Sequence, residues 1–143
     1  MIRLASAALA LLLLPACADR GPRQVVVVGT DYAFEAPATL IPGPTTFVFE
    51  NRGQVDHEVI FALLRDGIGI DDMQKAIQEG VDPEQLVEGG ASILIAGPGE
   101  TSVGQVLLDL LPGRTYALVC TFEDAEGAPP HIALGMVSSF DVQ

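Results

Sequence analysis

Apolar and polar residues alternate in short runs over most of the chain, and this pattern predicts β-strands. Four valines at 25–28, stopped by Gly29, are typical of a buried strand. After a turn at 51–53, His57 begins a run in which every second residue is apolar, so its imidazole is expected on the same face as Phe61. Further strands are expected at 45–50, 101–108, 115–120 and from 136 onward, with glycine and proline turns between them. Many short strands of this kind indicate an all-β sandwich.

One segment breaks the alternation and predicts a short helical insert at about 70–88. An acidic pair starting at Asp71 suits the first turn of a helix, and Gly80 suits its end. Asp82, followed by proline, fits the N-cap of a second short helical turn. Met73 shares helical spacing with other apolar residues of the insert, which is typical of packing, so we do not count it as a candidate metal ligand.

The N-terminal residues have the features of an export signal. Arg3 precedes an apolar run at 4–14, which is shorter than the roughly 20 residues that span a bilayer. The run ends in Leu-Pro-Ala-Cys17, which resembles a bacterial lipobox. Cleavage there would remove 1–16 as a signal peptide and leave Cys17 as a lipid-bearing first residue. The alternative is ordinary cleavage after Ala18, which would discard Cys17.

This N-terminus predicts an exported protein, in the bacterial periplasm or on the outer face of the cell envelope. Residues 17–24 are expected to form a lipid-anchored tether and 25–143 a single domain. The membrane would then be contacted only through the lipid on Cys17.

The charge balance restricts the partners that the protein can bind. The chain has 19 acidic against 7 basic residues, a formal net charge of −12. Such acidity argues against binding to nucleic acid or to anionic membrane surfaces. It favours solubility and attraction of a basic protein partner.

Soft metal-binding side chains are scarce in this sequence, and four of them occur in an informative order. His57 and His131 are the only histidines, and His131 lies between Cys120 and Met136. Two imidazoles, a thiolate and a weak thioether form the ligand set of a mononuclear blue copper site. Each of these residues alone is more often part of a core or surface, but together they predict a soft-metal site. Zinc is an alternative for two histidines and one cysteine, although no second cysteine pair is present.

The sequence offers little support for catalysis, and we expect the protein not to be an enzyme. Cys120 could pair with a histidine as a nucleophile, but it follows a predicted strand instead of starting a helix. Neither a phosphate-binding glycine loop nor a metalloprotease helix motif occurs. Asp71 and Asp72 are adjacent, so on a helix they point about 100° apart and do not form a catalytic pair.

Two segments, 49–59 and 112–136, resemble the cupredoxin family of blue copper proteins, the plastocyanin and azurin type. The resemblance implies a Greek-key β-sandwich that holds one copper ion, with His57, Cys120 and His131 as equatorial ligands and Met136 as the axial ligand. Two features differ from the usual family pattern. Ten residues separate Cys120 from His131, and Glu58 stands where an asparagine often ties the two ligand loops together.

The function implied by this resemblance is one-electron transfer through the Cu(I)/Cu(II) couple. A redox partner such as a cytochrome or a copper oxidase is expected from the acidic charge. The alternatives are a copper carrier and a cupredoxin-like binding module without metal. The acidic loop at 121–130 favours a site that is somewhat more open than in small cupredoxins.

Overall fold

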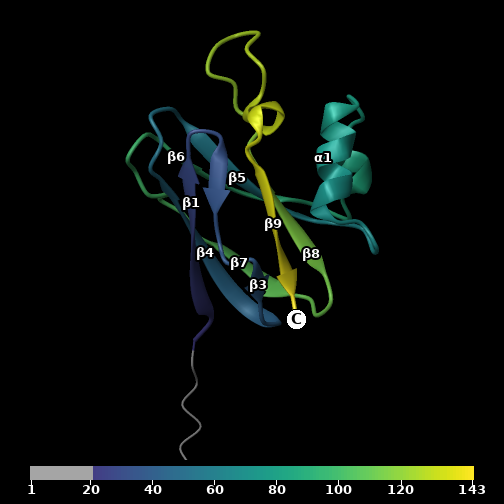
Figure 1. The fold of residues 1–143 in the computed structure, drawn as a ribbon. Coiled ribbons are helices and arrows are strands. Elements are labelled where there is room, and N and C mark those ends of the chain that lie inside the picture. Colours follow the sequence, from purple (N-terminus) through teal and green to yellow (C-terminus); the bar gives the residue numbers. More distant parts are fainter. Residues whose placement is uncertain (1–20) are drawn as a thin grey trace, which may run out of the picture.

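A computed structural model describes residues 21–143; the predicted signal peptide and the first half of the predicted tether, with Cys17, lie outside these residues. Two β-sheets pack face to face, with one short helix beside them (Figure 1). The first sheet has the strand order β2-β1-β4-β7, with bounds Ala33–Glu35, Arg23–Thr30, Gly43–Asn51 and Val106–Leu110. The second has the order β3-β9-β8-β5-β6, with bounds Thr39–Leu40, Val137–Val142, Thr115–Val119, His57–Leu63 and Ser92–Ala96. This confirms the expected Greek-key β-sandwich.

The parallel pairing of β1 with β4 determines which turns lie together at one end of the sandwich. Its register places Gly29 opposite Asn51, near the last residues of both strands. Because parallel strands end at the same edge of a sheet, the turn after β1 lies beside the turn that precedes β5. That edge is the one at which the candidate ligands converge.

The core between the sheets is built by the inward-facing residues of the alternating runs. Along β4 the buried residues are Thr45, Phe47, Phe49 and Asn51, every second position. The Phe47 ring lies 4.7 Å from the ring of Phe61 and contacts further aromatic rings of the core. Burial of such rings removes large apolar surfaces from water and is the main force holding the two sheets together.

The helical insert covers part of the outer face of the five-stranded sheet. It consists of α1 (Ile70–Gln78) and the 3-10 helix η1 (Pro83–Leu86), as the sequence predicts. Met73 is 2% exposed and packs in a small apolar cluster with Leu64 and Val119, which confirms its structural role. Among the described residues, no helix has both the length and the apolar character needed to cross a bilayer.

Several strand limits differ from the prediction. β1 begins at Arg23, inside the predicted tether, because Arg23 and the next residue pair with β4. β6, which the pattern does not predict, pairs with β5 along the run that starts at His57. β7 begins only at Val106, because the Ser102 hydroxyl accepts a hydrogen bond from the Phe49 amide and donates one to Gly104, which bends the chain there.

Candidate metal centre

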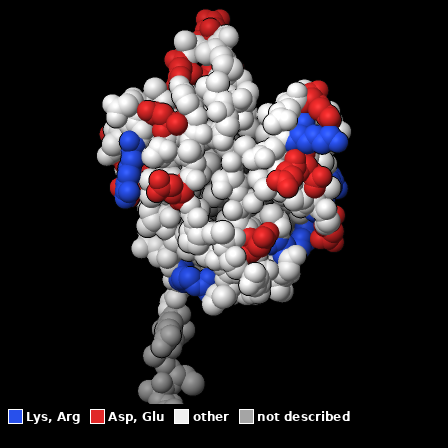
Figure 2. All heavy atoms as spheres, in the orientation of Figure 1, with Lys and Arg blue, Asp and Glu red and all other residues white. Residues whose placement is uncertain are grey.

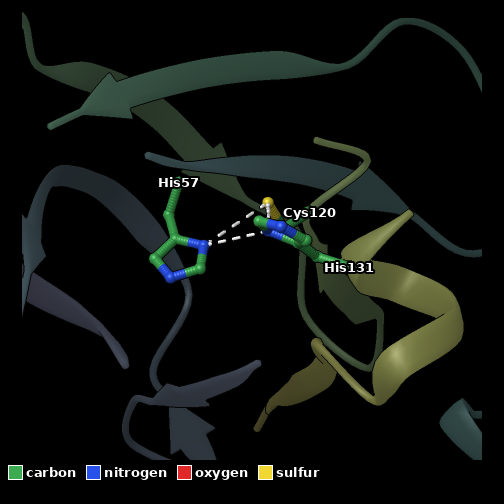
Figure 3. Close-up of side chains that lie close together, drawn as sticks. All are labelled: His57, Cys120 and His131. Carbon is green, nitrogen blue, oxygen red and sulfur yellow. Dashed lines mark hydrogen bonds between the residues drawn. The ribbon is translucent and has the colours of Figure 1, made fainter. Parts of the chain in front are cut away.

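Three of the four predicted ligands converge at one end of the sandwich. The Nδ1 atoms of His57 and His131 lie 3.1 Å apart, and Sγ of Cys120 lies 3.9 Å from the first and 3.4 Å from the second (Figure 3). These donor atoms are mutually within 4.8 Å. All three residues are buried, with exposed fractions of 0% for His57 and Cys120 and 1% for His131.

His57 is positioned by a hydrogen-bonded turn that follows β4. The buried amide of Asn51 donates to the carbonyls of Val55 and Ala96, and its oxygen accepts from the Gly53 amide. This side chain therefore joins β4, the turn and β6. A Cβ on Gly53 would lie only 2.8 Å from Nε2 of His57, so glycine is required where the turn passes the imidazole.

Cys120 follows β8, and its sulfur lies close to the backbone at the start of β5. The backbone amide of Glu58 donates to Sγ at 3.5 Å. Burial raises the pKa of the Cys120 thiol above its ordinary value, and hydrogen bonds from the amides of Glu58 and Phe122 only partly offset this effect. A bound metal ion would remove the thiol proton outright.

His131 returns to the site at the end of the loop 121–130, which projects beyond the sandwich (Figure 1). It begins the 3-10 helix η2 (His131–Leu134), and its amide donates to the carbonyl of Phe122 at 2.8 Å. This bond closes the base of the loop. The more open site expected from the length of this loop is not found, because His131 is 1% exposed.

Met136, the fourth predicted residue, is connected to two of the others through its backbone. Its carbonyl accepts from the amide of Cys120 at 3.2 Å, and its amide donates to the carbonyl of His131 at 2.9 Å. The side chain is fully buried, and a Cβ built on Gly29 would lie 3.4 Å from its methyl carbon. The methionine is thus packed at the end of β1, in the same layer as the ligand-bearing turns.

Both imidazoles also have a carboxylate on the side away from the sulfur. Nε2 of His57 lies 3.3 Å from Oδ1 of Asp31, and Nε2 of His131 lies 3.0 Å from Oδ1 of Asp124. Burial holds the pKa of His57 below its usual value, so its imidazole is neutral at neutral pH. A hydrogen bond from the Gln54 amide lowers the pKa of Asp31, and one from the Tyr32 hydroxyl lowers the pKa of Asp124.

Of the two carboxylates that contact the imidazoles, the sequence analysis places only Asp124 near the site. Asp124 belongs to the acidic loop between Cys120 and His131, but its distance from the imidazole follows only from the folded loop. Asp31 lies in an exposed turn and has no sequence signal that separates it from other acidic residues.

The sequence alone does not show that Glu58 can link the two ligand loops in place of the usual asparagine, but in the structure it does. Its Oε1 atom accepts from the amide of Thr121 at 3.0 Å and from the Thr121 hydroxyl at 2.7 Å. Thr121 directly follows Cys120, and Glu58 directly follows His57. The glutamate therefore ties the two ligand-bearing segments together, as an asparagine often does in the family that the sequence resembles.

The donor atoms are spaced as a single tetrahedral soft-metal ion requires. With bonds of about 2.0–2.1 Å to nitrogen and about 2.3 Å to sulfur, tetrahedral angles separate two nitrogens by about 3.3 Å and a nitrogen from the sulfur by about 3.6 Å. The observed separations are 3.1 Å between the nitrogens and 3.4 and 3.9 Å from nitrogen to sulfur. Imidazole and thiolate donors are the chemistry of copper and zinc sites.

Comparison with known proteins identifies the fold. No protein-family model and no curated protein matches the sequence. Among solved structures, the chain is similar to a dithionite-reduced auracyanin from Roseiflexus castenholzii, with a TM-score of 0.52, 19% identity, and coverage of 84% of this chain and 96% of that one. It is also similar to auracyanin B, with a TM-score of 0.54, 21% identity and 93% coverage of both chains. The auracyanins are cupredoxins, and these similarities show that this chain has the cupredoxin fold.

Proposed function

We propose that this protein is a type 1 copper protein that carries single electrons through one copper ion bound by His57, Cys120 and His131, with Met136 as a weak axial ligand. The observation that carries the proposal is the convergence of two imidazole nitrogens and one sulfur, all buried and within 4.8 Å of one another. When bound, copper would supply the Cu(I)/Cu(II) couple, and the axial ligand would tune its potential.

The protein's own residues prepare this site in three ways. Burial keeps the His57 imidazole neutral, which ligation requires. The amide of Glu58 points at the Cys120 sulfur, where it stabilises a thiolate. Hydrogen bonds that the Asn51 amide donates and that the Glu58 carboxylate accepts hold the ligand loops in place, so the metal-binding atoms need to move little between the two charge states of the ion.

Electron transfer is favoured over copper delivery by the burial of the ligands. A carrier must release its ion to an acceptor, and release is easiest from exposed ligands. Here the exposed fractions of the three ligands do not exceed 1%, and Asp124 of the loop 121–130 contacts His131. The same burial and the raised pKa of the Cys120 thiol disfavour a nucleophilic enzyme, which needs an accessible, acidic thiol.

The proposed setting is outside the cytoplasm, with the mature chain attached to the membrane through a lipid on Cys17. The proposed partner is a basic redox protein such as a cytochrome or a copper oxidase. Acidic side chains lie on the loop that projects beyond the site (Figure 2), where residues 121–130 include Glu123, Asp124 and Glu126 and no lysine or arginine. This acidic surface would steer a cationic partner toward the copper ligands.

The test is to express residues 20–143, add Cu(II) and record the visible spectrum. We expect one equivalent of copper, an intense band from the copper–thiolate bond, and loss of that band in Cys120→Ser. Bound metal without the band would favour a zinc site, and failure to bind one equivalent would refute the proposal.

A matched pair of methionine variants tests the axial ligand. Met136→Leu is expected to shift the reduction potential and the spectrum, because Met136 is the proposed weak ligand. Met73→Leu removes an equally buried methionine from the helical insert and should change neither. Equal behaviour of the two variants would contradict the axial role of Met136.

A further inference from the structure

Both candidate histidine ligands have a second polar contact, on the side of the ring opposite the nitrogen that faces the sulfur. Each ring presents Nδ1 to the Cys120 sulfur and directs Nε2 at a carboxylate oxygen, 3.3 Å away for His57 and 3.0 Å for His131. A neutral imidazole that ligates through Nδ1 carries its proton on Nε2. Because both rings are buried, each Nε2–H needs a hydrogen-bond acceptor from the protein.

Each of these carboxylates is itself held in place. Oδ1 of Asp31 accepts a hydrogen bond from the Gln54 amide at 2.8 Å. Oδ2 of Asp124 accepts one from the Tyr32 hydroxyl, while its Oδ1 faces His131. Neither carboxylate is therefore free to rotate away from its imidazole without losing a second bond.

Asp31 and Tyr32 are consecutive residues of the turn after β1, so one turn serves both imidazoles. Asp31 reaches His57 directly, and Tyr32 reaches His131 through Asp124. The Tyr32 ring also packs edge-on against both imidazoles, with ring centroids 5.0 Å from His131 and 6.4 Å from His57.

The backbone of this turn is unusual. Tyr32 has φ 66°, and among the described residues it is the only non-glycine residue with a positive φ. A bulky side chain in this left-handed region is uncommon and disfavoured, so the surrounding contacts must stabilise it. The contacts that do so are those of Tyr32 with Asp124 and with the two imidazoles.

We propose that Asp31, Tyr32 and Asp124 are positioning residues of the metal centre. They hold both imidazoles as the Nε2–H tautomer with Nδ1 toward the ion, and the two carboxylates favour the more highly charged state of that ion. The part that concerns copper rests on the proposed function, whereas the tautomer assignment applies to any ion bound between the two Nδ1 atoms, zinc included, and does not.

The expected loss of metal affinity can be taken from the known effect of removing similar hydrogen-bond partners. Removing a hydrogen-bond partner of a metal-ligating histidine typically weakens metal binding by about 10- to 100-fold. The Asp31 and Asp124 side chains are 38% and 35% exposed, so water screens part of their charge. We therefore expect the lost hydrogen bond to reduce affinity more than the lost charge does.

The first experiment uses the Zn(II)-loaded protein, because the two Nδ1 atoms lie only 3.1 Å apart and need an ion between them if both rings carry their proton on Nε2. Zn(II) is a d¹⁰ ion without redox chemistry, so ¹H–¹⁵N spectra can be recorded with the site filled. We expect an Nε2–H signal from each histidine that exchanges slowly with water, and loss of this protection at His57 in Asp31→Ala and at His131 in Asp124→Ala. Wild-type protection in both variants would overturn the assignment.

The second experiment measures Cu(II) affinity and reduction potential. Asp31→Ala and Asp124→Ala should each bind Cu(II) about 10- to 100-fold more weakly, with a smaller loss for Cu(I) and hence a raised potential. Tyr32→Phe removes only the hydroxyl that holds Asp124 and should produce a weaker effect of the same sign. Glu126→Gln is the control, because it removes one negative charge from the same loop without a contact to either histidine, and it should leave the affinity within about twofold.

The outcomes separate this inference from the proposed function. A wild-type protein that holds Zn(II) with both Nε2–H protons protected but forms no copper–thiolate band would refute the copper function and leave the positioning role standing. A wild-type copper protein whose aspartate variants match Glu126→Gln in affinity and potential would refute the positioning role alone.

Discussion

The link between Glu58 and Thr121 allows a quantitative prediction about how the ligand loops are held. Glu58 is 5% exposed and accepts two hydrogen bonds from Thr121, which itself is exposed. A typical intramolecular hydrogen bond contributes about 1 kcal/mol net. Because water can replace part of the bonding of an exposed threonine, we expect Glu58→Ala to lower the free energy of unfolding by about 1–2 kcal/mol.

Two further variants separate hydrogen bonding from charge and packing. Glu58→Gln keeps an oxygen that can accept both bonds, so it should cost less than about 0.5 kcal/mol. Thr121→Val keeps the amide but loses the hydroxyl and should cost about 0.5–1 kcal/mol. In the Glu58→Ala, Thr121→Val double variant, the losses should fall short of additivity by about 0.5–1 kcal/mol, because both changes remove the same bond.

Urea unfolding of the metal-free protein measures these differences in stability. The copper–thiolate band of the loaded protein shows whether the ligand loops keep their positions. Equal losses in Glu58→Ala and Glu58→Gln would mean that charge or packing, and not the bonds to Thr121, explains the burial of Glu58. Strict additivity in the double variant would likewise refute the direct link.

Three other predictions follow from the core and the site. Gly53→Ala would place a Cβ 2.3 Å from Oδ1 of Asp31, so we expect a loss of about 1–3 kcal/mol in urea unfolding and weaker metal binding; an unchanged protein would contradict the tight packing of this turn. The pKa of His57 is lowered from 6.5, so the unfolded chain takes up a proton there before the folded one does, and the stability of the metal-free protein should fall as the pH drops below about 7. His57→Gln should flatten that part of the stability profile, and an unchanged slope would assign it to other groups. Phe47→Ala, at a residue with no exposed surface, should cost about 3–5 kcal/mol in urea unfolding, whereas Leu107→Ala, at a residue 62% exposed, should cost little; similar losses would refute the core assignment.

Much of the scaffold is predictable from the sequence because its signals are local. The run of four valines and the alternation of apolar and polar residues predict the strands that begin near Val25, Thr45, His57 and Thr115, and the structure contains strands at each of these places. Helical spacing identifies the insert and explains why Met73 packs instead of binding a ligand. The scarcity of histidine and cysteine then restricts the soft-metal ligands to very few candidates, of which His57, Cys120 and His131 converge.

The tertiary structure alone decides what surrounds those ligands. β6 is not predicted, because its exposed Ile93 and Ile95 obscure the alternation that pairing with β5 makes clear. The length of the 121–130 loop favours an open site, yet the exposed fraction of each of the three ligands in the structure does not exceed 1%.

Asp31 lies 26 residues before His57, and nothing near it in the sequence marks it as a partner of the imidazole. Its position follows from the parallel register of β1 and β4, which brings the turns after both strands to one edge. Local patterns thus determine which residues become strands and which can bind a metal. The pairing of distant strands determines which polar side chains meet them, because a hydrogen bond requires two groups to lie within about 3 Å in space, however far apart they are along the chain.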